Sequence, residues 1–241
     1  MVFPLNGSKL DPMPTTLITG ANRSLGYETA RRLIEAGHDV WIGARDAAKG
    51  QEAADALGAR FVQLDVTDDA SVAAAVETVS ETGLDVLINN AGIAGEFKPV
   101  AETTVDDLRP VFEINVFGSL RVFKAFLPLL EQSSRPVVVN VSSGMGSLGR
   151  TNEPGTDENG FTNLHYSPSK AALNMLTSQL ARSYPALRVN AADPGYTATD
   201  FNHHRGHQTV EEGTDAIVEL AQLGPDGPTG EFRDRHGLVP W

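Results

Sequence analysis

Tyr166 and Lys170 stand four positions apart in a segment, Tyr166-Ser167-Pro168-Ser169-Lys170, that leads into a helical pattern. On an α-helix this spacing puts the phenol and the ammonium on one face. A cation held near the hydroxyl favours the phenolate and lowers a pKa of about 10 toward neutrality, where a general acid or base works best. The pair alone is a weak signal, because Tyr and Lys meet at this spacing on many exposed helices.

Two other segments agree with a catalytic pair. An apolar strand-like segment over 137–141 ends in Ser142-Ser143, and a glycine-rich turn over 19–26, Thr-Gly-Ala-Asn-Arg-Ser-Leu-Gly, lies between a strand and a helix. Such a turn lets backbone N–H groups and the helix dipole meet a pyrophosphate at close range. Gly20 and Gly26 supply the room, although their spacing is not that of the G-x-G-x-x-G fingerprint. We interpret the turn as one end of a dinucleotide site.

The elements that must position these residues alternate between strands and helices. The expected strands cover 15–19, 39–44, 60–64, 86–89, 136–141, 188–192 and a short segment near 231–233. The expected helices cover 25–36, 47–57, 69–81, 105–132 with a break near Gly118, 163–184 and 210–222. This alternation is typical of βαβ units and of a parallel sheet that is covered on both faces. The sequence therefore predicts an α/β fold, a doubly wound Rossmann sheet of about seven strands.

The domain organisation follows from length and local composition. A chain of 241 residues with 41% hydrophobic residues can bury one full core, so we expect a single Rossmann-fold domain over 13–241. Residues 1–12 show no periodicity and are interpreted as an N-terminal leader that an expression vector could have added. The segment 150–160, rich in Asn, Pro, Gly and acidic residues, is expected to be a surface loop.

Charge and cysteine content exclude several classes of function. The net charge of −12 leaves no basic face for nucleic acid or anionic lipid. The chain has no Cys, which excludes disulfides, a thiolate nucleophile and cysteine-bound metal centres. No apolar stretch approaches the roughly 20 residues that span a bilayer, and no signal peptide is recognised. These features predict a soluble cytoplasmic protein.

Three charged residues near strand ends indicate which dinucleotide binds. Arg45 follows the second expected strand, where NAD-binding folds often place an acid on the ribose 2′-hydroxyl. An arginine there would bind a 2′-phosphate, and Arg23 offers a second cation, so NADP(H) is favoured over NAD(H). The alternative is that both arginines are merely solvated. Asp65 could accept a hydrogen bond from the adenine amino group or could cap the next helix, in competition with Asp68 or Asp69.

Together these motifs resemble the short-chain dehydrogenases/reductases, in particular the NADP(H)-preferring, carbonyl-reductase-like members. The likeness extends from Thr15 to about Asp200. It includes the glycine motif over 19–26, Asn89-Asn90-Ala91-Gly92, Asn115 within a helix, and the segment Asp193-Pro194-Gly195-Tyr196-Thr197-Ala198-Thr199-Asp200. Any one of these motifs is weakly specific, whereas all of them in order are specific.

The resemblance implies a reductase of ketones or aldehydes that works by hydride transfer and is reversible. Its catalytic tetrad would be Asn115, Ser143, Tyr166 and Lys170. Tyr166 would protonate the developing alkoxide, Ser143 rather than its neighbour Ser142 would orient that oxygen, and Asn115 would position a water that links Lys170 to solvent. Residues implied to contact the cofactor are Gly20, Asn22, Arg23, Ser24, Leu25, Gly26, Arg45, Asp65, Val66, Asn90, Ala91, Gly92, Tyr166, Lys170, Pro194, Gly195, Thr197 and Thr199.

The chain departs from the family pattern in two places. Ser24 stands where the family usually has a glycine, so that a hydroxyl lies next to the phosphates and is expected to bind them instead. The separation of Ser143 and Tyr166, 23 positions, is longer than usual because of the 150–160 segment. In carbonyl-reductase-like relatives such inserts cover a helix face used for oligomerisation, so a monomer or a dimer is expected rather than a tetramer.

Two other functions compete with this interpretation. A dinucleotide-binding sensor on the same fold would bind NADP(H) without turnover, but the complete tetrad argues against it. A sugar-nucleotide epimerase would need a substrate domain, and only about 40 residues follow Asp200. His203, His204 and His207 could suggest a metal site, but the sequence spacing provides no further ligand, so we expect a substrate-side loop and no metal.

Overall fold

One continuous sheet organises the protein. The computed structural model describes residues 13–241, so the predicted leader over 1–12 lies outside the described residues. The sheet has eight strands in the order β3-β2-β1-β4-β5-β6-β7-β8. All neighbouring strands pair in parallel except β7 and β8, which form an antiparallel pair. The predicted Rossmann sheet is therefore confirmed, with one strand more than the expected seven.

The strands closely follow the apolar segments of the sequence. They are β1 (Thr15–Thr19), β2 (Asp39–Ala44), β3 (Arg60–Gln63), β4 (Val86–Asn89), β5 (Val137–Val141), β6 (Arg188–Ala192), β7 (Phe232–Asp234) and β8 (Gly237–Leu238). Every residue of β1, β4 and β5 is buried. Strands covered on both faces read as continuous apolar runs, which explains why the central strands were the easiest to predict.

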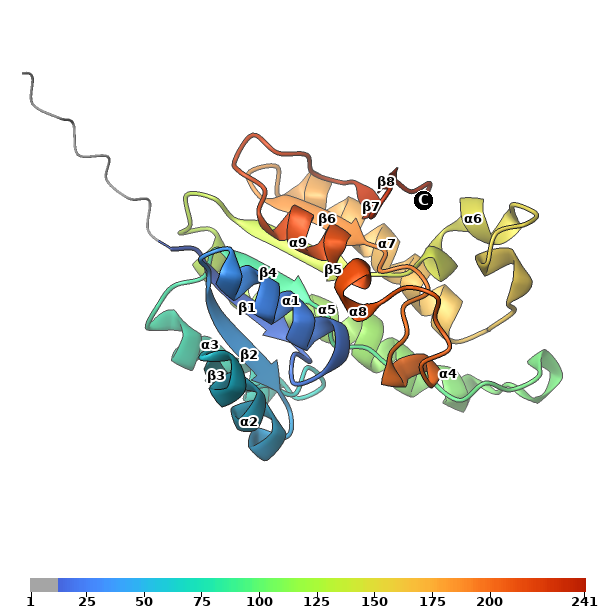
Figure 1. Ribbon diagram of the computed structural model, residues 1–241, viewed down its shortest axis with the longest axis horizontal. Helices are drawn as coiled ribbons and strands as arrows, with labels where there is room; N and C mark the ends of the chain where they lie inside the picture. Colours follow the sequence, from blue (N-terminus) through green and yellow to red (C-terminus); the bar gives the residue numbers. More distant parts are fainter. Residues whose placement is uncertain (1–12) are drawn as a thin grey trace, which may run out of the picture.

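The helices form a layer on each face of the sheet. They are α1 (Ser24–Glu35), α2 (Ala47–Leu57), α3 (Asp69–Ser80), α4 (Val105–Phe112), α5 (Ser119–Leu130), α6 (Leu148–Asn152), α7 (Tyr166–Ser183), α8 (Val210–Gly213) and α9 (Asp215–Ala221). One buried cluster joins the sheet to α1, α2 and α9, and a second joins it to α3, α5 and α7. Figure 1 shows α1 and α9 on the near side of the sheet. The doubly wound arrangement is thus confirmed.

Several boundaries differ from the prediction. The expected helix over 105–132 is interrupted by a π-helical turn, η2 (Glu113–Gly118), at the predicted break. The expected surface loop over 150–160 is wrong in part, because α6 and the 3-10 turn η4 (Glu158–Gly160) occupy most of it. Ser147 accepts a hydrogen bond from the N–H of Arg150 and so caps α6, a local signal that the composition of the segment obscured.

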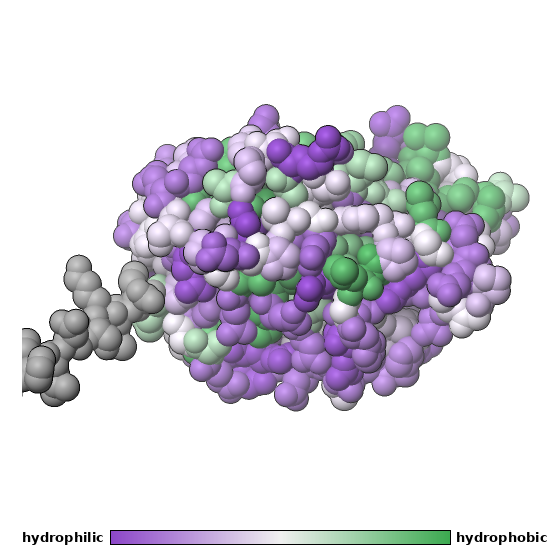
Figure 2. Space-filling model, turned by 90° about the horizontal axis from the view of Figure 1, so that it is seen from above, coloured by the Kyte–Doolittle hydropathy of each residue, from purple (hydrophilic) through white to green (hydrophobic). Residues whose placement is uncertain are grey.

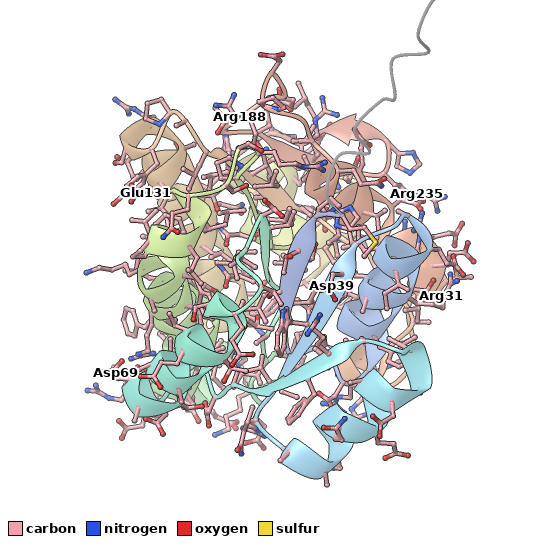
Figure 3. The ribbon with its side chains drawn as sticks, turned by 90° about the vertical axis from the view of Figure 1, so that its left-hand side faces the viewer. Arg31, Asp39, Asp69, Glu131, Arg188 and Arg235 are labelled. Atoms are coloured by element: carbon pink, nitrogen blue, oxygen red, sulfur yellow. The ribbon has the colours of Figure 1, made fainter. Side chains whose placement is uncertain are left out.

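The carboxyl ends of the parallel strands define the functional end of the molecule. In Figure 1 the strand arrows point to the right, toward α6 and the loops that follow β4 and β6. The opposite end, seen in Figure 3, carries Asp39 at the start of β2 and Arg188 at the start of β6. Open α/β sheets bind ligands at the carboxyl ends of their strands, where the strand order reverses. Here the order reverses between β1 and β4.

Candidate active site

Two adjacent serines end β5, and the structure gives them different partners. Ser142 is buried, and its hydroxyl donates to Asn174 Oδ1 on α7 at 2.5 Å. Ser143 has extended backbone, accepts a hydrogen bond from the Met145 N–H at 3.2 Å, and its hydroxyl faces Tyr166 closely enough to lower the pKa of that phenol. Successive strand residues point to opposite faces, so only one of the two hydroxyls can face Tyr166. That residue is Ser143.

Tyr166 and Lys170 lie together in the first turn of α7. Asn163 Oδ1 accepts from the Tyr166 N–H at 2.6 Å, which fixes the start of the helix. The Lys170 ammonium lies 5.7 Å from the centre of the Tyr166 ring and donates to the carbonyl of Val141 at 2.7 Å. The spacing in the sequence therefore brings the phenol and the ammonium to one place, at the end of β5.

The pKa of Tyr166 differs from the sequence-based expectation of a value lowered by Lys170. Burial raises the pKa of the phenol well above its usual range, the hydrogen bond with Ser143 opposes this shift, and the negative charge of Asp193 adds to it. Burial also lowers the pKa of Lys170 to about 8, against the attraction of Asp193. The expectation that Lys170 lowers the pKa of Tyr166 is therefore wrong for this structure. The loss of solvation of the phenol on burial outweighs the influence of the buried Lys170 amine.

Asn115 occupies the π-helical turn η2 and is fully buried. Its side-chain amide donates to the carbonyl of Ile93 at 3.0 Å and accepts from the N–H of Ile93 at 2.9 Å. It also donates to Ser169 Oγ on α7 at 3.0 Å, one position before Lys170. Asn115 therefore connects the loop after β4 to the helix that carries Tyr166 and Lys170.

The glycine-rich turn packs against the loop after β4 with no space for side chains. A Cβ on Gly26 would lie 2.6 Å from Asn90 Nδ2, and a Cβ on Gly20 would lie 3.0 Å from the Cα of Ala91. Asn90 Nδ2 donates to the carbonyls of Thr19 and Gly20, at 2.8 and 3.1 Å. The turn and the 90–92 segment thus form one rigid unit at the start of α1.

Gly92 links this unit to the catalytic pair. A Cβ on Gly92 would lie 3.2 Å from Asn115 Oδ1 and 3.7 Å from Lys170 Nζ. Ser24, the departure from the family glycine, has a φ of 50°, in the left-handed region that favours glycine. The backbone at Ser24 therefore keeps the conformation that a glycine would adopt.

The predicted adenosine end of the site is charged and exposed. Arg45 is exposed at the end of β2, and its carbonyl accepts from Gln63 Nε2 at 3.1 Å. Arg23 is also exposed but pairs with Asp200 at 3.4 Å rather than lying free. Asp65 accepts from the N–H and the hydroxyl of Thr67, which lower its pKa, whereas Asp68 caps α3. The alternative that Asp65 caps this helix is therefore wrong.

The remaining predicted contacts lie on neighbouring loops. Thr197 and Thr199 are buried, and Thr197 donates to the carbonyl of Pro194 at 2.7 Å. Gly195 has a φ of 64°, as its turn requires. Val66 is buried beside Gly118 of η2. The other two residues, Asn22 and Leu25, are half-buried at the start of α1.

The three histidines after β6 do not converge on one point. His204 Nε2 lies 3.0 Å from Asp200, whereas His207 Nδ1 lies 3.8 Å from Asp157. Within residues 13–241, no group of three or more His, Asp or Glu side chains could hold a metal ion. No helix in the same range is long and apolar enough to cross a membrane.

Sequence reasoning missed two charged residues at the site. Asp193 ends β6 with its side chain 1% exposed, and Arg150 on α6 reaches it at 3.2 Å. Asp193 is part of the motif quoted above, and an acid directly before Pro194-Gly195 was the available signal. Arg150 gave no signal, because two of its three acidic partners, Asp193 and Asp234, lie 43 and 84 positions away in the chain.

The comparisons with known proteins agree with this fold and arrangement of side chains. Residues 14–209 match the family model described as short chain dehydrogenase, and the chain belongs to this family. Within the family it is a carbonyl-reductase-like oxidoreductase.

Three relatives illustrate the likeness. The chain is 31% identical to the (+)-neomenthol dehydrogenase of Capsicum annuum over an alignment of 294 positions including gaps, which covers 90% of this chain and 94% of the relative. The structure of salutaridine reductase from Papaver somniferum is similar with a TM-score of 0.81 and 29% identity, covering 92% of this chain and 99% of that one. NADPH-bound carbonyl reductase from chicken fatty liver is similar with a TM-score of 0.84 and 28% identity, covering 95% and 99%.

Proposed function

We propose that this protein is an NADPH-dependent reductase that converts a ketone or an aldehyde to an alcohol, reversibly. The observation that carries the proposal is the meeting of Ser143, Tyr166 and Lys170 at the end of β5. The Ser143 hydroxyl is close enough to Tyr166 to lower the pKa of the phenol, and the Tyr166 ring centre lies 5.7 Å from Lys170 Nζ. A proton donor, an orienting hydroxyl and a cation are the groups needed to reduce a carbonyl.

The glycine-rich turn fits a dinucleotide. The bare backbone at Gly20 and Gly26, which has no space for a Cβ, leaves the N–H groups at the start of α1 free of obstructing side chains. Gly92 lies within reach of both Asn115 and Lys170, so the turn and the catalytic pair face one continuous surface. When bound, the reduced nicotinamide supplies the hydride. The turn over 19–26, Asn90 and the Pro194-Gly195 turn would hold the dinucleotide.

The side chains would then act on the carbonyl oxygen. Burial keeps the pKa of Tyr166 high, so its hydroxyl stays protonated at neutral pH, as a general acid requires. Ser143 would donate to the same oxygen and orient it. Lys170, with a pKa of about 8, is largely charged at neutral pH and would stabilise the phenolate left on Tyr166. Asn115 would hold a water that reconnects Lys170 to solvent.

Arg45 supports a preference for NADPH over NADH. It is exposed at the carboxyl end of β2, the position from which a side chain reaches the ribose of a bound dinucleotide. An arginine there can form charge-assisted bonds with a 2′-phosphate, and the exposed pair of Arg23 with Asp200 is weak enough to exchange partners. The NADPH-bound carbonyl reductase noted above agrees with this preference.

Exposed aromatic rings around Tyr166 support a substrate with an apolar body. Phe201 is 45% exposed and packs 5.4 Å from the Tyr166 ring. Phe97, 67% exposed, lies 6.3 Å from His165, the neighbour of Tyr166 in the chain. Figure 2 shows apolar residues gathered at the right-hand end of the molecule, the end that carries α6 in Figure 1. Exposed apolar patches of this kind mark binding sites.

The test is consumption of NADPH and of NADH with cyclic ketones, aldehydes and quinones that carry apolar substituents. Tyr166→Phe should lower kcat/KM by roughly 10²- to 10⁴-fold, the usual contribution of a positioned general acid. Tyr184→Phe is the matched control, because Tyr184 ends the same helix and its ring packs 5.5 Å from Phe123. It should leave turnover within about twofold of wild type.

Cofactor binding separates catalysis from sensing. Fluorescence titration with NADPH should give the same affinity for wild type and Tyr166→Phe within a few-fold, because the phenol acts mainly on the substrate. Tight NADPH binding by wild type, with no turnover of any compound in the panel, would favour a dinucleotide-binding sensor instead.

A further inference from the structure

A cluster of buried charges lies directly behind the catalytic residues. The Arg150 guanidinium contacts Asp193 at 3.2 Å, Asp234 at 2.5 Å and Glu158 at 3.5 Å. The side chains of the three acids are at most 15% exposed. These residues come from the neighbouring segments α6 and η4, from the residue after β6 and from β7, so the cluster joins three regions that are distant in the sequence. A buried carboxylate is costly unless it is paired and hydrogen-bonded.

Asp193 contacts two turns as well as the arginine. Its Oδ1 accepts from the N–H of Gly195 at 2.9 Å, and its carboxylate packs against the backbone of Gly144, which interacts with it strongly enough to lower its pKa. Gly144 follows Ser143, and Gly195 follows Pro194 in the turn proposed to hold the nicotinamide. One carboxylate therefore bridges the turn that carries the orienting serine and the turn that would carry the cofactor.

A residue with a side chain could not replace Gly144 or Gly195 without moving the turn away from Asp193. A Cβ on Gly144 would lie 2.9 Å from Asp193 Oδ2, and it would meet Glu158 Oε1 still closer. Gly195 has a φ of 64°, which residues with a side chain rarely adopt. The approach of both turns to Asp193 is thus built into the backbone.

We propose that Asp193 is a positioning residue that fixes the Ser143 turn relative to the Pro194-Gly195 turn, and that Arg150 is brought in by the 144–165 segment to support it. The inference rests on the function proposed above. It explains the long spacing between Ser143 and Tyr166, because the 144–165 segment between them carries Arg150, the partner of the Asp193 carboxylate.

Burial raises the pKa of Asp193, whereas the backbone N–H of Gly195 and the Arg150 guanidinium oppose that shift and favour the carboxylate. The charge of the carboxylate also acts on the catalytic pair. It raises the pKa of both Tyr166 and Lys170. The charged groups that face Asp193 are Arg150, Glu158 and Asp234 on one side and Tyr166 and Lys170 on the other. Removing the charge should therefore lower the pKa of both catalytic groups. A purely structural contact would not do this.

The decisive variant is Asp193→Asn, which keeps the shape and removes the charge. We expect kcat/KM to fall by about 10- to 100-fold, the cost of a small misplacement of reacting groups. The alkaline limb of the reductive pH profile should move to lower pH, because Tyr166 loses its proton more easily. Lys170 Nζ, followed by ¹⁵N NMR and assigned with Lys170→Arg, should titrate at lower pH than in wild type.

The matched control is Asp39→Asn, which breaks the ion pair with Arg60 at 2.9 Å at the opposite end of the sheet. It should leave kcat/KM, the pH profile and the Lys170 titration unchanged. If Asp193→Asn does not fold, Arg150→Lys replaces it, since a lysine keeps the charge but cannot bridge two carboxylates. Its kcat/KM should fall by about tenfold with little change in the Lys170 titration.

Two results would overturn the inference. One is an Asp193→Asn protein whose pH profile and Lys170 titration match those of wild type, even if its melting temperature falls. The other is an Arg150→Lys protein with the kcat/KM of wild type. If wild type itself shows no turnover, the proposed function fails separately, because the Lys170 titration is measured in protein without cofactor and still tests the role of Asp193.

Discussion

The different partners of Ser142 and Ser143 predict that two neighbouring Ser→Ala substitutions have opposite effects. Ser142→Ala removes the donor to Asn174 Oδ1, a buried bond of 2.5 Å, and leaves a buried acceptor without its partner. Such a loss costs about 1–3 kcal/mol. For a domain of 241 residues each kcal/mol lowers the melting temperature by roughly 2–4 °C, so we expect a fall of roughly 2–12 °C.

Ser143→Ala should affect catalysis rather than stability. The one hydrogen bond that its hydroxyl accepts, from the Met145 N–H, is long at 3.2 Å, so the melting temperature should change by less than about 2 °C. Losing one donor to a developing oxyanion costs about 10²- to 10³-fold in kcat. Ser142→Ala should keep kcat within about threefold of wild type at a temperature well below its transition.

Thermal unfolding by circular dichroism and steady-state reduction with NADPH, on the same preparations, measure both effects. The activity of Ser142→Ala is measured about 20 °C below its own melting temperature, where the variant is still folded. Different roles for the two serines are refuted if Ser142→Ala then loses as much kcat as Ser143→Ala. They are equally refuted if Ser143→Ala is the less stable of the two.

Three further predictions concern the turn, the cofactor end and the sheet. Ser24→Gly should raise the melting temperature by roughly 2 °C in calorimetry, because the left-handed strain at φ 50° outweighs the added backbone freedom of glycine. Arg45→Glu should lower the ratio of kcat/KM for NADPH over NADH by about 10- to 100-fold, since an acid repels a 2′-phosphate. Burial, helped by Arg135, lowers the pKa of His38 to about 4, so the fold favours the neutral imidazole. Its contribution to the free energy of unfolding is full above about pH 6.5 and lost as the pH falls toward 4, and urea titrations of His38→Gln should show a flatter pH dependence.

The sheet could be predicted from the sequence because its signals are local. The segments 15–19, 39–44 and 86–89 consist mainly of apolar and β-branched residues and coincide with β1, β2 and β4. A buried parallel strand can be recognised from such a run alone. The helices between the strands can be recognised from their own hydrophobic period of about 3.6 residues, which shows where one strand ends and the next begins. The antiparallel β8 was missed because two residues, Gly237–Leu238, carry no periodicity at all.

The catalytic residues could be predicted for a similar reason. Tyr166 and Lys170 are four positions apart on one helix, so their meeting is decided by local geometry. Their pKa values could not be predicted, because these depend on burial and on Asp193, which approaches from another strand. The sequence indicated which groups lie together but gave no measure of how much water surrounds them.

The composition of the 150–160 segment predicted a surface loop, although Arg150 at its start turns inward to Asp193. Asn, Pro, Gly and acidic residues favour turns, yet the segment contains a short helix whose start is fixed by Ser147. The Ser147 hydroxyl donates to the carbonyl of Pro240 at 2.6 Å and accepts from the Arg150 N–H at 3.0 Å, so the C-terminal segment sets where α6 begins. The direction of Arg150 toward Asp193 and Asp234 therefore depends on the C-terminal segment as well as on local capping. Partners 43 and 84 positions away leave no pattern around Arg150 in the sequence, so they can be recognised only in the folded protein.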